Sequence, residues 1–500
     1  MNTPPDNSPV RPTAGLAVAR LDSQTVGQSE TPVAQPFGHS LTQSSDRSQA
    51  IRRLIWLYFW LLLFEGALRK WVFPQFSSLL LIVRDPVLLL CYAEAFRKGR
   101  FPGNGFIVSI TVLGGLSFLI SLGQIGLGAI SSTVAVTLYG MRANFLHLPL
   151  IFLIAETFDR RDVEAIGKWL LVLAAPMSVL VFVQYNAPPD AWINLGAGKG
   201  AEQIGVALSG IDKIRPAGLF SYHTGLTSYL SLLAAFIFYD FLQEKVYSRT
   251  LLIIGVASMV TMVPLSVSRT TFMAVTLVCA GAVLCGMLRP VLLRKSLKIA
   301  SVAAFAWLTF GSLLVLKEGM SILSARFEEA EGLKVGIVDR YLSGLTDAVD
   351  AAAAAPAFGK GLGMGTNAAA GLLFGQQKFL LAEGEWARVV LEMGAILGFA
   401  YIGLRVLLVV KIGRAAFARL ETLDTLPILL FSATGLLLLN GQFGQPMTLG
   451  FAVFGSGLCL AAATADKQLR RDVEKEPASD CNKPVLAKGR SAYAERLHGG

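Results

Sequence analysis

The chain has 500 residues, of which 53% are hydrophobic and only 16% are charged, and its mean hydropathy is +0.56. This composition excludes an ordinary soluble domain, in which about a quarter of the residues are charged. The formal net charge of +10 has the sign that nucleic acids attract, but the lysines and arginines lie mainly in short turns between apolar runs and in the tails. Membrane topology accounts for this distribution better, and we expect no nucleic-acid partner.

Residues 1–50 are rich in Ser, Thr, Pro and Gln without apolar periodicity, which is typical of a disordered tail. The first apolar run begins only after Arg53, so the tail lacks the pattern of a signal peptide. The region 51–316 then holds nine runs compatible with transmembrane helices, each of which needs about 20 residues. These runs lie at 54–66, 78–96, 104–121, 142–157, 164–185, 223–242, 250–266, 270–288 and 297–316. The Gly- and Thr-rich stretch 123–140 fits a re-entrant segment or a partial span.

The segment 317–385 is the longest interval between the later apolar runs, and its sequence is compatible with helix. The region 386–465 holds three further runs, and a charged tail follows them. The three runs lie at 386–410, 424–440 and 447–464, and the tail at 466–500. The sequence therefore predicts an all-α polytopic membrane protein with about twelve transmembrane helices and a long helical loop before the last three.

The orientation follows from the basic turns. If the N-terminal tail is cytoplasmic, every turn on the same side is basic: Arg97-Lys98-Arg100, Arg160-Arg161, Lys245 with Arg249, Arg289-Arg294-Lys295-Lys298 and Lys411-Arg414-Arg419. The positive-inside rule then places both termini in the cytoplasm and the loop 317–385 outside.

Several cations lie on the other side, against this rule. Arg69-Lys70 follow the first run, and the others are Arg84, Arg142, Arg215, Arg269, Arg388 and, within the long loop, Arg326 and Arg340. Each one alone is explained by snorkelling or by pairing with an acid such as Glu65 or Asp85. Five at similar depth on separate helices favour a shared anionic ligand, and a guanidinium fork suits the oxygens of a diphosphate.

Two glutamates flank Gly384 just before an apolar run. Glu383 and Glu385 fit N-terminal helix capping, and Glu385 can also pair with Arg388 at i,i+3 spacing. Our hypothesis is that one of the two is a catalytic base. His223 is a second candidate for binding an acceptor or accepting a proton, although a lone interfacial His is more often structural.

No metal or cofactor site is predicted. The five cysteines show no CxxC spacing, and the acidic residues of the long loop are spaced like a solvated helix face. The glycine-rich loop 359–365 follows an Ala-rich helical stretch and no strand, so it fails the context of a phosphate-binding loop. A turn, or a loop that lets a glycan approach closely, fits better.

Short motifs together resemble the O-antigen ligase and polymerase superfamily of bacterial surface-polysaccharide assembly, particularly members in exopolysaccharide synthesis. They are Phe64-Glu65-Gly66-Ala67-Leu68-Arg69-Lys70-Trp71, Ile82-Val83-Arg84-Asp85-Pro86, Arg215-Pro216-Ala217-Gly218-Leu219-Phe220, Ser268-Arg269, Pro356-Ala357-Phe358-Gly359-Lys360-Gly361, Glu383-Gly384-Glu385-Trp386-Ala387-Arg388 and Glu392-Met393-Gly394. The order of the motifs and the long outer loop before the tenth run add to the resemblance.

The resemblance implies a glycosyltransferase-like enzyme at the outer, periplasmic face of the bacterial inner membrane. Its donor would be a polyprenyl-diphosphate-linked glycan and its acceptor a glycan or lipid, with no cofactor or metal, in a bilayer shared with other polysaccharide-assembly proteins. Outer arginines would hold the diphosphate, and a base near the start of the span after the long loop would activate the acceptor. Ligases of this family carry a His about eleven residues before the Gly that is here Gly394, where this chain has Glu383. Ligation and polymerisation therefore both stay open.

The alternative from another class is a transporter or flippase of lipid-linked oligosaccharide. Transporters tend to have two related halves with interrupted helices in matching positions. The chain shows no such repeat, and its long loop divides the helices unevenly. This asymmetry favours the enzyme.

Overall fold

The structure is a computed structural model that describes residues 38–197, 207–208, 211–243, 246–310, 321–322, 324, 337–374 and 380–474. The chain divides into two compact units, Met1–Asp46 and Arg47–Gly500. In the first unit the described residues, 38–46, are helical. All further description concerns the second unit.

The described elements are almost all helices. They are, in chain order, α1 (Gly38–Ala67), η1 (Leu68–Val72), η2 (Pro74–Phe76), α2 (Ser77–Leu80), α3 (Arg84–Arg97), α4 (Gly105–Gly126), α5 (Val134–Met141), η3 (Arg142–Leu146), α6 (Leu150–Thr157), α7 (Arg160–Asn186), η4 (Trp192–Asn194), β1 (Ala207–Leu208), β2 (Ile211–Ile214), α8 (His223–Gln243), α9 (Arg249–Leu265), α10 (Arg269–Leu288), α11 (Pro290–Phe310), α13 (Ile337–Ala354), α14 (Asn367–Phe374), α15 (Glu385–Ala418), η5 (Arg419–Thr422), α16 (Leu426–Asn440) and α17 (Pro446–Glu474). The strands β1 and β2 form one antiparallel hairpin. The expected all-α class is confirmed.

Eight described helical segments are long and apolar enough to cross a membrane, as judged by length and composition. They are Pro74–Arg97, Gly105–Gly126, Val134–Thr157, Arg160–Asn186, His223–Gln243, Arg269–Leu288, Glu385–Thr422 and Pro446–Thr464. Two shorter apolar helices, α9 and α16, also coincide with predicted runs. The total of twelve spans and the side on which each terminus lies stay predictions.

Several predicted boundaries shift: α11 begins at Pro290, where 297 was expected, and α15 ends at Ala418, where 410 was expected. The run expected to begin at 142 belongs to a longer segment, Val134–Thr157, in which the π-helical turn η3 joins α5 to α6. The side chain of Thr133 accepts a hydrogen bond from the backbone N–H of Val136 and so caps α5. The Gly- and Thr-rich stretch thus contributes the end of α4, a turn and the start of this segment.

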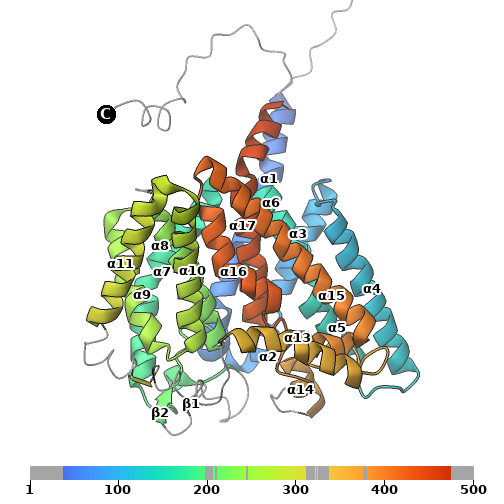
Figure 1. Cartoon of the computed structure of the whole chain (residues 1–500). Helices are drawn as coiled ribbons and strands as arrows, with labels where there is room; N and C mark the ends of the chain where they lie inside the picture. The colour runs from blue at the N-terminus through green and yellow to red at the C-terminus, as the bar shows by residue number, and fades with distance from the viewer. Residues whose placement is uncertain are drawn as a thin grey trace, which may run out of the picture. The chain divides into compact units, whose positions relative to one another are not determined.

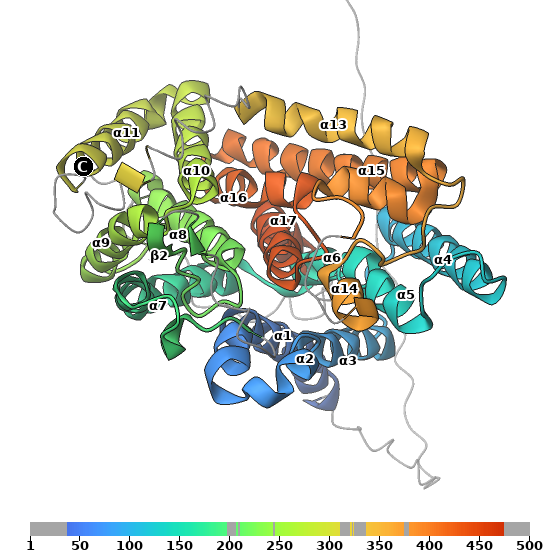
Figure 2. The ribbon, with the colours of Figure 1, turned by 90° about the horizontal axis from the view of Figure 1, so that it is seen from below.

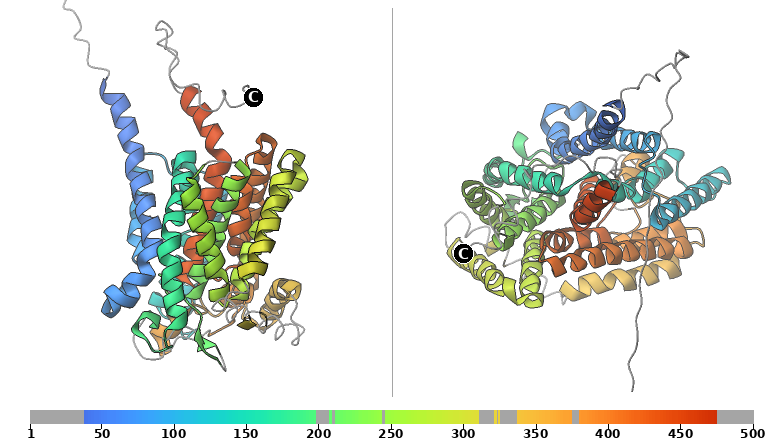
Figure 3. Two further views of the ribbon diagram at one scale, coloured as in Figure 1. Left: turned by 90° about the vertical axis from the view of Figure 1, so that its left-hand side faces the viewer. Right: turned by 90° about the horizontal axis from the view of Figure 1, so that it is seen from above.

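The long helices run roughly alongside one another, and short elements gather at one end of the bundle (Figure 1). At this end lie α2, the β1–β2 hairpin, α13 and α14, and we call it the hairpin face. The C-terminal part of α17 projects from the opposite end (Figure 3). Because consecutive long helices alternate in direction, the starts of α8, α10, α15 and α17 all lie at the hairpin face.

The core is built around α8 and α17. In each of these helices 94% of the residues of an apolar stretch are buried. In contrast, α4 and α9 expose large apolar side chains such as Val108, Leu119 and Ile253. Contiguous exposed apolar surface is typical of a face that contacts lipid or protein. These helices are therefore suited to face the bilayer.

The predicted loop 317–385 is described only in part. Residues 317–320, 323, 325–336 and 375–379 lie outside the described residues. Helix α13 packs along α15 across the hairpin face (Figure 2). It buries Ala348 and Ala351 and exposes the apolar side chains of Leu345 and Val349, so part of its apolar surface is not covered by the described residues.

Candidate functional site

Four of the predicted site residues lie at the hairpin face because they begin helices that start there. Arg84, His223, Arg269 and Glu385 are the first residues of α3, α8, α10 and α15. Side-chain contacts join these starts: Thr227 Oγ1 lies 2.6 Å from Thr271 Oγ1, and Thr224 Oγ1 lies 3.3 Å from Gln445 Oε1. Arg340 lies in α13, but its side chain is outside the described part of the chain, as is the whole of Arg326.

Two buried polar networks support this face. The first, which we call the α3 network, consists of Tyr58, Glu65, Arg69, Arg84, Asp85, Arg142 and His147. Within it the guanidinium of Arg84 is fully buried and donates to Glu65 Oε2 at 2.9 Å, to the Tyr58 hydroxyl at 3.4 Å and to the carbonyl of Pro446 at 2.7 Å. All three of its nitrogens therefore bind the protein itself.

The other half of the α3 network is centred on Asp85. Arg142 forms an ion pair with one carboxylate oxygen, and His147 Nε2 lies 3.1 Å from the other. The second ring nitrogen of His147, Nδ1, lies 3.0 Å from the hydroxyl of Tyr58. A neutral His147 that donates from Nε2 to Asp85 and accepts from Tyr58 satisfies every contact. Arg84 and Arg142 thus lie inside a closed network, and a direct contact of either with a ligand stays a prediction.

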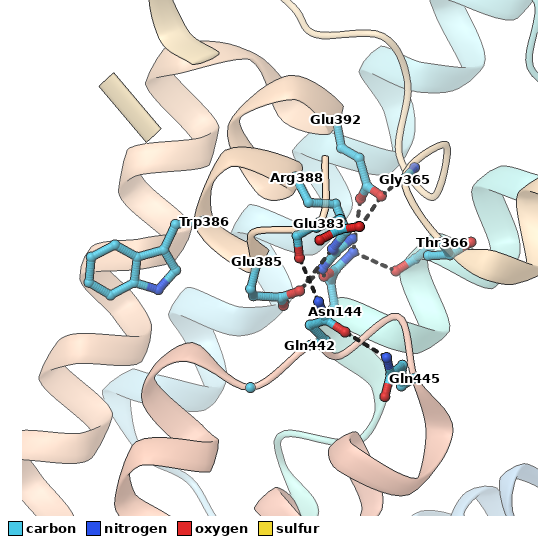
Figure 4. Close-up of polar contacts among 12 residues, drawn as sticks. Asn144, Gly365, Thr366, Glu383, Glu385, Trp386, Arg388, Glu392, Gln442 and Gln445 are labelled. Atoms are coloured by element: carbon cyan, nitrogen blue, oxygen red, sulfur yellow. Dashed lines mark hydrogen bonds and ion pairs between the residues drawn. The ribbon is translucent and has the colours of Figure 1, made fainter. Parts of the chain in front are cut away.

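The second network, which we call the α15 network, consists of Asn144, Glu385, Arg388, Glu392 and Arg405, all nearly inaccessible. Figure 4 shows the first four of these residues. Arg388 donates to Glu385 Oε2 at 2.9 Å, to Glu392 Oε1 at 2.7 Å and to Asn144 Oδ1 at 2.9 Å. Arg405 donates to Glu385 Oε1 at 2.7 Å. Two carboxylates balance two guanidiniums, so the network as a whole is neutral.

The predicted pair of Glu385 with Arg388 is confirmed, whereas the partner Arg405 was missed. Its signal is present in the sequence, because an Arg deep within the apolar run 386–410 requires a buried acceptor. Both carboxylate oxygens of Glu385 accept from guanidinium groups. Such a carboxylate is poorly suited to accept a proton from a substrate.

Glu383 differs from Glu385 in its surroundings. Its side chain is exposed, while its carbonyl accepts a hydrogen bond of 2.5 Å from Gln442 Nε2. Gly384 is the N-cap of α15 and no side-chain hydrogen bond caps the helix, whereas Glu385 lies in the first helical turn, where an acid interacts favourably with the helix dipole. Of the two predicted bases, only Glu383 presents a carboxylate to solvent.

The glycine-rich loop 359–365 supports the bend of α15. The N–H of Gly361 donates to the carbonyl of Glu392, and the N–H of Gly365 donates to Glu392 Oε1 at 2.8 Å. Gly394 has φ +79°, and a Cβ atom there would lie 2.2 Å from the carbonyl oxygen of Ala357. The glycines therefore serve close packing of backbone on backbone.

Two of the sequence motifs meet at the end of α1. A Cβ atom on Gly66 would lie 2.4 Å from the backbone of Ser221, so only glycine allows this approach. Arg69 donates to Ser221 Oγ at 3.1 Å, and Lys70 Nζ donates to the carbonyl of Gly218 at 2.7 Å. The motif after α1 thus packs directly on the turn that carries Arg215.

Lys70 is a buried cation that contacts no carboxylate within the described part of the chain. It is 6% exposed, and its contacts are the Gly218 carbonyl and the ring of Trp71. The α3 network beside it holds three arginines and two carboxylates, which leaves one positive charge in excess. Half-buried Arg215 precedes Gly218 by three residues. Several basic side chains therefore lie around this turn.

The buried position of Lys70 predicts a pH dependence of stability. Burial lowers the pKa of Lys70 from 10.5 to about 7. Between these two values the unfolded chain holds the proton and the folded chain does not, so stability rises with pH across this window and is lowest below it. We expect the melting temperature of the protein in detergent to rise from about pH 6 to about pH 9 more steeply than that of Lys70→Met. Identical slopes for the two proteins would refute the assignment.

Comparison with known proteins identifies no family for this chain. No family model matches the chain, and no curated protein matches its sequence. Among the described residues no group of three or more His, Cys, Asp or Glu side chains is placed to hold a metal ion.

Proposed function

We propose that this protein is a membrane glycosyltransferase-like enzyme of bacterial surface-polysaccharide or exopolysaccharide biosynthesis. It transfers or polymerises a polyprenyl-diphosphate-linked glycan at the hairpin face, which would be the outer face of the inner membrane. Its partners would be the lipid-linked glycan, a glycan or lipid acceptor, the bilayer and other polysaccharide-assembly proteins.

The observation that carries the proposal is the combination of groups at one face. Glu383 is an exposed carboxylate just before α15, and the half-buried cations Arg215 and Arg269 follow β2 and begin α10. These elements lie at the same end of the bundle (Figure 1). A diphosphate leaving group needs cations, and an acceptor hydroxyl needs a base, so this pairing of charges suits transfer from a lipid diphosphate. The neutral α15 network holds the start of α15, and with it Glu383, in place.

The chemistry balances without a cofactor. Glu383 accepts the proton of the acceptor hydroxyl while the oxygen of that hydroxyl forms a bond to the anomeric carbon of the donor sugar. The bond between that carbon and the phosphate oxygen breaks, and the polyprenyl diphosphate leaves with the electron pair. Arg215 and Arg269 stabilise the negative charge that develops on the leaving group.

A transport pathway is less well supported by the interior of the bundle. The buried stretch of α8 from Leu230 to Phe238 and that of α17 from Leu449 to Ala463 contain no charged residue. A carrier of a charged headgroup needs polar groups along its route through the membrane. These two central helices therefore favour chemistry at one face.

A reconstituted assay tests the proposal. The purified protein in liposomes receives the polyprenyl-diphosphate-linked glycan of its host, and the products are separated by size. We expect a longer or transferred glycan together with released polyprenyl diphosphate. Movement of an intact lipid-linked glycan between leaflets, without release of lipid diphosphate, would show that the protein is a flippase and not an enzyme.

Arg215 and Arg269, which we call the diphosphate clamp, give a prediction with a matched control. Arg215→Ala and Arg269→Ala should each lower the transfer rate by about 100-fold or more, because each removes a cation that stabilises developing charge. Arg249 is the control for Arg269, since each arginine directly follows a serine N-cap at the start of a helix. Arg249 begins α9 at the opposite end of the bundle, so Arg249→Ala should transfer normally. Equal rates for Arg249→Ala and Arg269→Ala, at equal membrane insertion, would refute the clamp.

A further inference from the structure

A turn of five residues, Gly441–Gln445, joins α16 to α17 at the hairpin face, and we call it the amide turn. Its two glutamines form a chain of hydrogen bonds between helix starts (Figure 4). Gln445 Nε2 donates to Gln442 Oε1 at 2.6 Å, and Gln442 Nε2 donates to the Glu383 carbonyl at 2.5 Å. At the other end, the hydroxyl of Thr224 donates to Gln445 Oε1 at 3.3 Å.

These contacts determine which way each amide points. The carbonyl of Glu383 can only accept, so the atom of Gln442 that faces it is the nitrogen, and Gln442 Oε1 is left to accept from Gln445 Nε2. Gln445 Oε1 then accepts from the hydroxyl of Thr224 and from Thr448 Oγ1 at 3.4 Å. Both side chains are half-buried, and each NH₂ group has a second N–H beyond the hydrogen bond given above.

Buried Arg405 binds the amide turn. Its guanidinium lies 3.8 Å from the ring centroid of buried Phe443 and donates to the carbonyl of Gly441 at 3.0 Å. The same guanidinium donates to Glu385 Oε1. One buried cation therefore binds both the amide turn and the start of α15, two residues after Glu383. This arrangement keeps the two glutamines and the exposed carboxylate in one rigid unit.

The chemistry of this unit suits hydroxyl groups rather than phosphate. A sugar hydroxyl both donates and accepts, and an amide presents a donor and an acceptor without net charge. A phosphate would instead be repelled by Glu383 and attracted by the cations around Lys70 and Arg215. The amide turn thus suits the acceptor sugar, whereas the turn that carries Arg215 suits the diphosphate of the donor.

Resting on the proposed function, we infer that the amide turn is the acceptor subsite, in which Gln442 and Gln445 bind a neutral sugar and direct one of its hydroxyls toward Glu383. His223, which precedes Thr224, begins the helix at the far end of the same chain of hydrogen bonds. The cationic groups are left to the diphosphate. The subsite is thereby separate from the proposed clamp.

The test measures binding and transfer separately. The probe is the oligosaccharide released by mild acid from the host's lipid-linked glycan, and inorganic diphosphate is the second probe. Gln442→Leu and Gln445→Leu should each weaken oligosaccharide binding by about tenfold, as expected for a lost hydrogen bond, and leave diphosphate binding unchanged. The same variants should raise the KM for the acceptor more than they lower kcat.

Gln243 provides a matched control at the opposite end of the bundle. Its Nε2 donates to the carbonyl of Leu423 at 2.5 Å, which is the distance that Gln442 makes to Glu383. Gln243→Leu should therefore bind the oligosaccharide and transfer glycan as the wild-type protein does. Gln445→Asn, which keeps an amide but shortens its reach, serves where a leucine variant fails to fold, and it should also weaken oligosaccharide binding.

The outcomes separate the two proposals. Unchanged oligosaccharide binding and an unchanged KM in the folded glutamine variants would overturn the subsite and leave the enzyme intact. Oligosaccharide binding that depends on Gln442 and Gln445, in a protein that never releases polyprenyl diphosphate, would overturn the enzyme and support the subsite as a glycan-binding site.

Discussion

Glu383→Gln should lower the rate of glycan transfer by about 10²–10⁴-fold, the range that general-base catalysis contributes. The glutamine keeps the size of the side chain, and the hydrogen bond from Gln442 goes to the backbone of residue 383, so the fold should be unaffected. Transfer is measured in a single turnover with lipid-linked donor in liposomes. Exposed Glu421, in η5, is the control, and Glu421→Gln should transfer normally.

Glu385→Gln distinguishes the two glutamates. Both oxygens of Glu385 accept from guanidinium groups, so this variant should lower the melting temperature as well as the rate. Suppose that Glu385→Gln melts at the normal temperature but transfers no glycan, while Glu383→Gln stays active. Glu385, and not Glu383, would then be the catalytic base. Unchanged transfer by both variants would remove the carboxylate base altogether.

Arg388→Met should destabilise the folded protein by about 3–5 kcal/mol, because it leaves buried carboxylates without their partner. Arg388 forms ion pairs with Glu385 at 2.9 Å and with Glu392 at 2.7 Å, and all three side chains are at most 4% exposed. Removing the cation changes the neutral α15 network to a net charge of −1 in an apolar interior. The measurement is the free energy of unfolding, or the melting temperature in one detergent, of the variant and the unchanged protein.

The chain contains a matched ion pair on its surface. Arg97 and Glu94 have the same i,i+3 spacing as Arg388 and Glu385, but the Arg97 side chain is 74% exposed. Exposed pairs contribute little because water screens them, so Arg97→Met should melt almost as the unchanged protein does. If Arg388→Met also melted unchanged, the α15 network would have no structural role at this face.

Local sequence patterns were sufficient for several features. Apolar runs bounded by charged turns marked the helices, because a membrane-length helix needs only its own consecutive residues to be apolar. The pair of Glu385 and Arg388 followed from i,i+3 spacing within one helix. The positions of Arg215, Arg269 and His223 at one end of the bundle followed from the alternation of helix direction.

The partners of the buried cations depended on contacts between residues far apart in the chain. Arg84 donates to Pro446 and Lys70 to Gly218, across 362 and 148 residues. No periodicity encodes such pairs, so Arg84 and Arg142 could be placed at a face but not in a closed network.

The amino-acid sequence by itself thus determined the all-α class of this protein, the approximate positions of most of its apolar helices and the end at which its charged motifs gather. Only the tertiary structure decided which charges are neutralised and which remain available: Glu385 is held by two arginines, while Glu383, two residues earlier, is exposed. The physical reason is that apolarity and helical spacing are local properties of a chain. The state of a charge depends instead on every group that folding brings within a few ångströms of it.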